Sequence, residues 1–246
     1  QAMMNTTDLV KAVKEGTFEK DDIDLKNCLK AFVKAYEARD QKEMETATRA
    51  LRNELFKRGH INGSKDSQQD AEEAVFRPLL SAANYGPQER TTMTFNLNGV
   101  EIKKVVPETP VLPMIPLQIG GGRDLQELIN TTFSPENVND PANAYRYTSD
   151  DGVEHLIPEF NKQTQLIGNP DYMFIHLKRF SAEWDNESKS VKLKKIEDPL
   201  NLPAGGVVDL SIAYGAAGKG EKKYLYEVDS VVVHEGGTGG GHYFTN

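Results

Sequence analysis

The sequence predicts an α+β fold in which a helical N-terminal lobe precedes a lobe of antiparallel strands. Over about the first 84 residues, apolar side chains recur at the spacing of helix faces. From about residue 90 onward, apolar and polar side chains alternate, and glycine-rich turns separate the segments. Because helices and strands are segregated along the chain, an α+β fold is favoured over an alternating α/β fold.

Three helices are expected first, over residues 6–16, 24–40 and 42–59. Gly16 and Gly59 follow the first and third of these, where glycine commonly ends a helix. The second helix has an apolar face formed by Leu25, Cys28, Leu29, Phe32, Val33 and Tyr36. The third has an apolar face formed by Met44, Leu51, Leu55 and Phe56. Such faces predict that the helices pack on one another.

A fourth helix is expected over residues 67–86. Ser67 is a candidate N-cap, and Asp70 lies three residues later, where an acidic side chain can bond back to the Ser67 N–H in a capping box. Pro78 should kink or shorten this helix, because proline lacks the N–H and its ring crowds the preceding turn.

The strand pattern begins with residues 91–107, in which Asn98-Gly99 is typical of a tight hairpin turn. Four prolines interrupt the pattern after this hairpin. Residues 124–133 predict one short helix, and residues 134–158 are polar and are expected to be irregular. Antiparallel strands are expected in five segments of the last third, 171–180, 190–196, 206–217, 222–237 and 242–246.

Composition limits the function classes. A net charge of −8 over 246 residues disfavours nucleic acid and favours a basic partner or peptide. No apolar run of about 18 residues is present, which disfavours a membrane span. The N-terminus lacks the pattern of a signal peptide, and a chain that does not begin with Met is expected to be a fragment.

The single cysteine, Cys28, excludes a disulfide within the chain and a cysteine-rich zinc site, and it favours a reducing compartment. The histidines do not pair with carboxylates at metal-binding spacing. We therefore expect no cofactor and no metal.

The C-terminal segment places five glycines between His234 and His242. Glycines without a Cβ let another backbone pass very close to His242. Taken alone, the segment favours a hairpin turn that carries an incidental surface histidine.

Three separated segments resemble the ubiquitin-specific protease family. "NPDYMFIHLKRF" (169–180), preceded by "KQTQLIG" (162–168), is similar to the family's palm strand. "YEVDSVVVHEGGTGGGHYF" (226–244) is similar to its histidine box, and "SQQDAEEAV" (67–75) to its Gln-Gln-Asp-Ala helix start. The segments occur in the family's order.

This resemblance implies a papain-like cysteine protease fold in one domain. A helical thumb would cover residues 1–84, a fingers-like region 85–160, and a β palm 161–246. The implied reaction is thiol-dependent hydrolysis of the peptide or isopeptide bond after the C-terminal glycine of ubiquitin, with ubiquitin or a ubiquitinated protein as partner. A monomer is expected.

The resemblance also implies roles for individual residues. "QAMMNT" matches the family's cysteine box, so Ala2 occupies the position of the nucleophile and His242 that of the general base. The chain would then bind its ubiquitin substrate but not cleave it. Ala2 would reflect either a deliberate inactivation or a natural loss of the cysteine. The ubiquitin tail would be bound by Gln69, Asp70, His234, Gly241 and Tyr243.

Several alternatives stay open. Ala2 can be an ordinary residue, and Cys28 is a rival nucleophile, although its place within an apolar helix face is typical of a buried hydrophobe. The Asp70 carboxylate can cap a helix, pair with an arginine of the ubiquitin tail, or do both. The chain can be a ubiquitin-binding pseudoenzyme or scaffold, or it can act on another ubiquitin-like modifier.

The chain departs from the family pattern in three places. The third catalytic residue of the family lies well beyond the histidine, and Asn246 is too close to His242 to replace it, so the orienting residue is expected outside this chain. The family's oxyanion asparagine would precede Gln1. Residues 85–160 contain none of the zinc-binding cysteines that many members carry. A cytoplasmic or nuclear location is expected, including delivery into the cytosol of a host.

Overall fold

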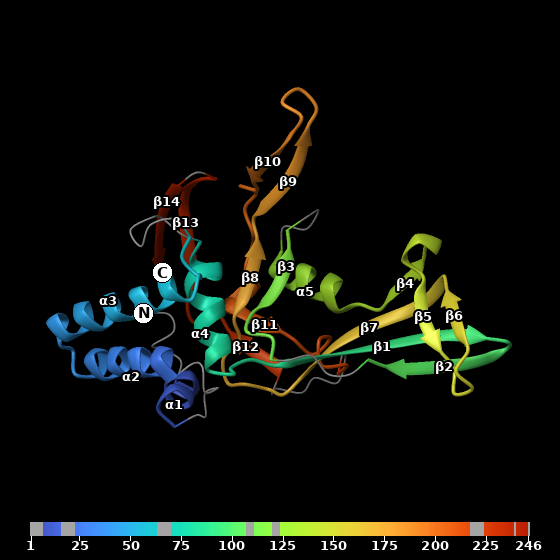
Figure 1. Cartoon of the computed structure of the whole chain (residues 1–246), viewed down its shortest axis with the longest axis horizontal. Coiled ribbons are helices and arrows are strands. Elements are labelled where there is room, and N and C mark those ends of the chain that lie inside the picture. Colours follow the sequence, from blue (N-terminus) through green and yellow to red (C-terminus); the bar gives the residue numbers. More distant parts are fainter. Residues whose placement is uncertain are drawn as a thin grey trace.

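A computed structural model of the 246-residue chain describes residues 7–15, 23–62, 70–106, 111–119, 124–216, 224–238 and 240–245. The N-terminal helices gather at one end of the molecule, and a long sheet extends to the other end (Figure 1). None of the described helices is long and apolar enough to cross a bilayer.

The first three predicted helices are confirmed as α1 (Thr7–Glu15), α2 (Ile23–Glu37) and α3 (Gln41–Lys57). They pack around a core that includes Val13, Leu25, Leu29, Val33 and Leu55. Phe56 was expected in this core but is 41% exposed. Leu55 occupies the inward position, and successive helical residues point about 100° apart, so Phe56 faces outward.

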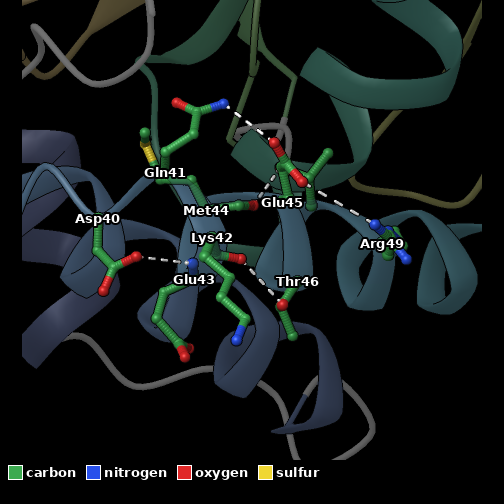
Figure 2. Close-up of polar contacts among 9 residues, drawn as sticks. Asp40, Gln41, Lys42, Glu43, Met44, Glu45, Thr46 and Arg49 are labelled. Carbon is green, nitrogen blue, oxygen red and sulfur yellow. Dashed lines mark hydrogen bonds and ion pairs between the residues drawn. The ribbon is translucent and has the colours of Figure 1, made fainter.

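The second helix ends three residues earlier than the sequence predicts. Arg39 adopts a left-handed conformation with φ 53°, and Asp40 is extended. The Asp40 side chain accepts the N–H of Glu43 at 3.0 Å and thereby caps α3. Figure 2 shows this cap and the side chains of the next turns, including Thr46, whose hydroxyl donates to the Lys42 carbonyl at 3.0 Å.

The fourth predicted helix is divided into a π-helical turn, η3 (Glu72–Phe76), and a short α-helix, α4 (Arg77–Ala82). The N–H of Arg77 bonds to the Glu72 carbonyl five residues back. Pro78 has no N–H to offer Ala74, so the regular helix cannot continue through this turn. The expected disturbance at Pro78 is thus confirmed.

Residues 134–158 are not irregular, as the sequence suggested, but contain three short strands and one 3₁₀ turn. These are β4 (Glu136–Asn139), η4 (Pro141–Asn143), β5 (Tyr145–Thr148) and β6 (Glu154–Ile157). Most of their side chains are solvent-exposed, which hides the alternation that marks a half-buried strand. A small hydrophobic cluster, Phe95, Tyr147, Ile157 and Phe160, holds this region together.

The long sheet has the strand order β2-β1-β7-β4. β1 (Gln88–Leu97) and β2 (Val100–Val105) form the predicted hairpin, in which Asn98 and Gly99 have φ values of 55° and 82°. β7 (Glu159–Ile167) pairs with β1 and with β4. The strand therefore crosses the expected border between the fingers-like region and the palm.

Among the described strands, one pair is parallel and joins the expected palm to a strand from the expected fingers-like range, which corrects the expectation of an entirely antiparallel palm. β3 (Ile115–Gln118) runs parallel to β8 (Ile175–Lys178), and the proline-rich segment that seemed to interrupt the strands supplies β3. β3 pairs with a single partner strand and is therefore an edge strand. Proline, which has no N–H to donate, is tolerated at such an edge, and this accommodates Pro116.

The remaining palm strands form antiparallel pairs: β9 (Phe180–Asp185) with β10 (Ser190–Lys195), β11 (Val207–Asp209) with β12 (Leu225–Glu227), and β13 (Val232–Gly237) with β14 (Gly240–Thr245). The 3₁₀ turn η5 (Ala204–Gly206) precedes β11. α5 (Leu125–Phe133), as predicted, packs on this lobe through a core that includes Ile115, Leu117, Ile129, Leu166 and Leu210.

Candidate active-site cleft

A cleft of about 1540 Å³ separates the helical lobe from the palm. Phe76 lines it from the helical side, and Tyr172 and Phe174 line it from the segment before β8. The Phe174 ring lies 6.2 Å from that of Phe76 and 6.3 Å from that of Tyr85. These ring contacts fix the two lobes relative to each other at the apolar part of the cleft.

The rim of the cleft is acidic. Among the residues that the structure describes, two cations, Arg179 and Lys195, face it. Eight carboxylates of the described ranges line it: Asp70, Glu72, Asp171, Glu197, Asp198, Glu227, Asp229 and Glu235. The cleft therefore favours a positively charged ligand.

The β13–β14 hairpin closes one side of this cleft and carries both C-terminal histidines. In its register, His234 lies opposite Tyr243, and Glu235 lies opposite His242. Because side chains alternate along a strand, the first pair and the second pair occupy opposite faces of the hairpin. In Figure 1 the hairpin lies at the same end of the molecule as α2, α3 and α4.

Asp70 links the helical lobe to the hairpin. Its Oδ1 accepts the N–H groups of Glu72 at 2.8 Å and Glu73 at 3.1 Å, so the carboxylate caps the helical turn that follows. Its Oδ2 accepts the hydroxyl of Tyr243 at 3.0 Å. Ser67, its expected partner in a capping box, lies outside the described residues.

The hydroxyl of Tyr243 is a proton donor in this contact. Burial, together with the nearby Asp70 carboxylate, raises the pKa of Tyr243 to about 12. The phenol therefore keeps its proton at neutral pH and can donate it to the Asp70 carboxylate.

His234 and Gly241 are packed against each other inside the hairpin. The His234 ring lies 4.7 Å from the Tyr243 ring and 6.1 Å from the Phe180 ring. A Cβ on Gly241 would lie only 2.5 Å from His234 Nε2. The same Cβ would lie 2.2 Å from the backbone carbonyl oxygen of Glu235, so this position requires glycine even if the His234 ring moves.

The structure thus brings together four of the predicted site residues, Asp70, His234, Gly241 and Tyr243. The fifth, His242, belongs to the same hairpin, but its side chain is exposed on the other face and does not line the cleft. Ala2, Gln69 and Asn246 lie outside the described residues.

Cys28 lies half-buried in α2 and does not line the cleft. Burial raises the pKa of its thiol, and the carboxylates of Glu54 and Asp24 raise it further. A thiol in such surroundings carries little thiolate at neutral pH, which argues against Cys28 as a nucleophile.

Lys195 and His176 are cleft residues that the sequence analysis did not identify. The Lys195 Nζ donates to the carbonyls of His234 at 3.1 Å and Gly236 at 2.5 Å. The sequence does contain an indication that Lys195 is unusual. Val191 and Leu193 alternate with polar residues, and Lys195 stands at the next position, where this alternation predicts an apolar residue. His176, on β8, has a buried Nδ1 that lacks a hydrogen-bond partner within the described part of the chain.

No group of three His, Cys, Asp or Glu side chains with metal-binding geometry occurs among the residues that the structure describes.

An α+β molecule with a cleft between a helical lobe and a strand lobe has the architecture of papain-like cysteine proteases. Within that class, the chain belongs to the ubiquitin carboxyl-terminal hydrolase family, whose family model matches residues 1–246. The resemblance seen in the sequence is therefore confirmed at the level of family.

Curated relatives match a smaller part of the chain. Ubiquitin carboxyl-terminal hydrolases 9 and 10 of Arabidopsis thaliana are each 40% identical over 83 residues, which is 34% of this chain and 8% of each relative. Ubiquitin carboxyl-terminal hydrolase 12 of Saccharomyces cerevisiae is 39% identical over 83 residues, or 33% of this chain and 6% of that protein.

Solved structures share the fold. The SAGA Ubp8/Sgf11/Sus1/Sgf73 DUB module bound to ubiquitin aldehyde contains a chain with a TM-score of 0.63 and 15% identity, and the match covers 98% of this chain and 56% of that one. A substituted form of the module, bound to monoubiquitin, gives a TM-score of 0.62 with 16% identity, and covers 98% and 55%. The predicted α+β fold of the ubiquitin-specific protease type is thus confirmed.

Proposed function

We propose that this chain is a thiol-dependent deubiquitinase domain that binds the C-terminal tail of ubiquitin and, in the sequence with Ala2, does not cleave it. One observation carries the proposal. The hydrogen bond between Tyr243 and Asp70 joins two segments that are 173 residues apart and that each match a motif of the family. Both residues line the acidic cleft, and we place the tail beside them.

The acidic rim suits the proposed ligand. The ubiquitin tail is basic and ends in Gly-Gly, as the family resemblance implies, and carboxylates around a cleft attract such a peptide. Asp70 would pair with an arginine of the tail, because each carboxylate oxygen can accept more than one hydrogen bond. His234, Tyr243 and Gln69 would line a narrow passage for the two glycines.

The reaction requires a thiol at position 2. Because His242 lies on the hairpin face opposite the cleft, the reaction requires position 2 and the scissile bond to lie on that face of the hairpin. A thiolate at position 2 would attack the carbonyl carbon of the scissile bond, after His242 takes the thiol proton. The C–N bond then breaks, and His242 returns the proton to the leaving lysine amine. Water hydrolyses the resulting thioester. Ala2 has no sulfur, so the chain as it stands is limited to binding.

The substitution Ala2→Cys tests this proposal. The substituted chain is treated with ubiquitin that carries an electrophile at its C-terminus, and adduct formation is followed by mass spectrometry. We expect a covalent adduct on Cys at position 2 and none on Cys28. Failure to form an adduct, although ubiquitin binds, would contradict the enzyme interpretation.

Ala2 itself favours a second candidate, a ubiquitin-binding pseudoenzyme or scaffold. Binding of unmodified ubiquitin in the micromolar range without any reaction of the Ala2→Cys chain would support it. Probes built on other ubiquitin-like modifiers test the third interpretation, in which a different modifier is the substrate.

The remaining expectations are also proposals. A location in the cytosol or nucleus, or delivery to the cytosol of a host, is supported by the single cysteine. The monomeric state is likewise a proposal. The net charge of −8 supports a protein partner over nucleic acid.

A further inference from the structure

The side chain of Lys195 ties strand β10 to the hairpin that carries His242. Its Nζ donates to the carbonyl oxygens of His234 at 3.1 Å and of Gly236 at 2.5 Å. Lys195 is the last residue of β10 and is partly buried, whereas its neighbour Lys194 is exposed and approaches Glu183. Two lysines of one strand thus have different environments.

The two carbonyls belong to the residues before and after Glu235, which lies opposite His242 in the hairpin. Residues two apart on a strand direct their carbonyls to the same side, so one ammonium group can reach both. The residue between them, Glu235, is the register partner of His242. Lys195 therefore holds the backbone on either side of the residue that faces His242.

The hairpin needs such a tether for a physical reason. Ordering a glycine costs more backbone entropy than ordering any other residue, and this hairpin contains five glycines around its turn. Gly236 has a φ of +133°, and a Cβ there would lie 2.5 Å from Gly241 Cα, so the strands touch closely at this point. A two-stranded hairpin is only marginally stable on its own.

Each strand of the hairpin is tied to the rest of the molecule by a side-chain hydrogen bond. Tyr243 binds Asp70 from β14, and Lys195 binds the carbonyls of β13. The first contact reaches the helical lobe and the second reaches the palm. Loss of the Lys195 contact leaves β13 without its hydrogen bonds to β10.

We infer that Lys195 is a positioning residue, which holds the β13–β14 hairpin so that His242 is set for proton transfer. The inference rests on the proposed function, in which His242 is the general base. It adds a residue that does not touch the reacting atoms and acts through two backbone carbonyls.

The first measurement uses the chain without ubiquitin and is independent of activity. Hydrogen exchange of residues 232–245 is followed by mass spectrometry in Lys195→Met, which keeps the length of the side chain and removes the donors. We expect exchange there to accelerate about tenfold or more, because hydrogen bonds to charged groups are lost. Lys195→Arg, which retains donors, should restore slow exchange.

Lys194→Met is the matched control, because it removes the same charge from the adjacent position of the same strand. Its exchange over residues 232–245 should equal that of the unchanged protein. Equal exchange in Lys195→Met and Lys194→Met would overturn the inference, whether or not the protein proves to be an enzyme.

The second measurement separates positioning from binding. In the Ala2→Cys background, Lys195→Met should lower the rate constant of adduct formation at saturating ubiquitin probe by roughly 10- to 100-fold, since misplacing a catalytic group by about 1 Å has an effect of this size. Ubiquitin affinity should change less than about twofold. A rate equal to that of Lys194→Met would overturn the inference. If no variant forms an adduct, the proposed enzyme function fails, and the exchange experiment alone decides the role of Lys195.

Discussion

Asp70 uses its two carboxylate oxygens for two different contacts. Oδ1 caps the turn that begins at Glu72, and Oδ2 accepts the hydroxyl of Tyr243. The sequence predicted a capping role and a ligand-binding role for this residue, and the two are geometrically compatible. The contact with Tyr243 could not be predicted from local pattern, because tertiary packing alone brings together residues so far apart in the chain.

Substitution of Asp70 should separate these two roles. Asn is about as good an N-cap as Asp, so Asp70→Asn should lower the free energy of unfolding by less than about 0.5 kcal/mol. The same change removes the charge, and we expect ubiquitin to bind at least about tenfold more weakly, in line with the loss of a charge-assisted hydrogen bond. Calorimetric titration and urea unfolding measure the two quantities.

Asp70→Ala is the companion variant, which removes cap and charge together and should cost about 1 kcal/mol of stability. If both variants bind ubiquitin as tightly as the unchanged chain, Asp70 is a capping residue only.

At the scale of elements, the sequence predicted the helices and the hairpin that have a periodic pattern, and it missed the short strands. The three N-terminal helices, the Asn98-Gly99 hairpin and α5 all have strong local patterns, and each is confirmed. The strands between residues 134 and 158 have four residues each, mostly exposed, so burial does not impose a pattern on them. The parallel pairing of β3 with β8 depends on long-range topology, which local pattern does not contain.

The β13–β14 hairpin also shows that glycines in one element are not equivalent. A Cβ on Gly241 would approach His234 Nε2 to 2.5 Å, whereas a Cβ on Gly237 would have no heavy atom within 4 Å. We expect Gly241→Ala to lower the free energy of unfolding by about 1–3 kcal/mol through overpacking. It should also weaken ubiquitin binding, because the His234 ring must move.

Gly237→Ala is the control for this prediction, with the same added methyl group in the same hairpin. Its stability should stay within about 0.5 kcal/mol of the unchanged chain, as is usual for surface substitutions. Urea unfolding of the two variants tests the difference. Equal destabilisation would show that the close approach of Gly241 to the Glu235 carbonyl oxygen and the His234 ring does not constrain this position.

At the scale of the whole molecule, the cleft lies where three parts of the chain meet. The helical lobe contributes Asp70, the palm contributes Lys195, and the C-terminal hairpin contributes His234 and Tyr243. The motif segments predicted most of these residues through family resemblance, since each motif is a short stretch of sequence. Lys195 belongs to none of these motifs, and only the folded arrangement shows its contact with the hairpin.

The charge of the whole molecule gives a prediction about binding kinetics. With a net charge of −8 and eight carboxylates around the cleft, the field should attract a basic peptide from a distance. Raising the ionic strength from about 0.05 to 0.5 M shortens the Debye length from about 14 to about 4 Å. We therefore expect the association rate of ubiquitin with this chain to fall severalfold, while the dissociation rate changes less.

Stopped-flow measurements with fluorescent ubiquitin test this expectation. Asp70→Asn should reduce the salt dependence only slightly, because it removes one charge among the eight carboxylates of the cleft. A variant with several rim carboxylates replaced, such as Glu197→Gln with Asp198→Asn and Glu227→Gln, should reduce it clearly. An association rate that does not respond to salt would contradict long-range attraction of ubiquitin by the acidic rim. The rim carboxylates would then act only in the bound complex, through short-range pairing.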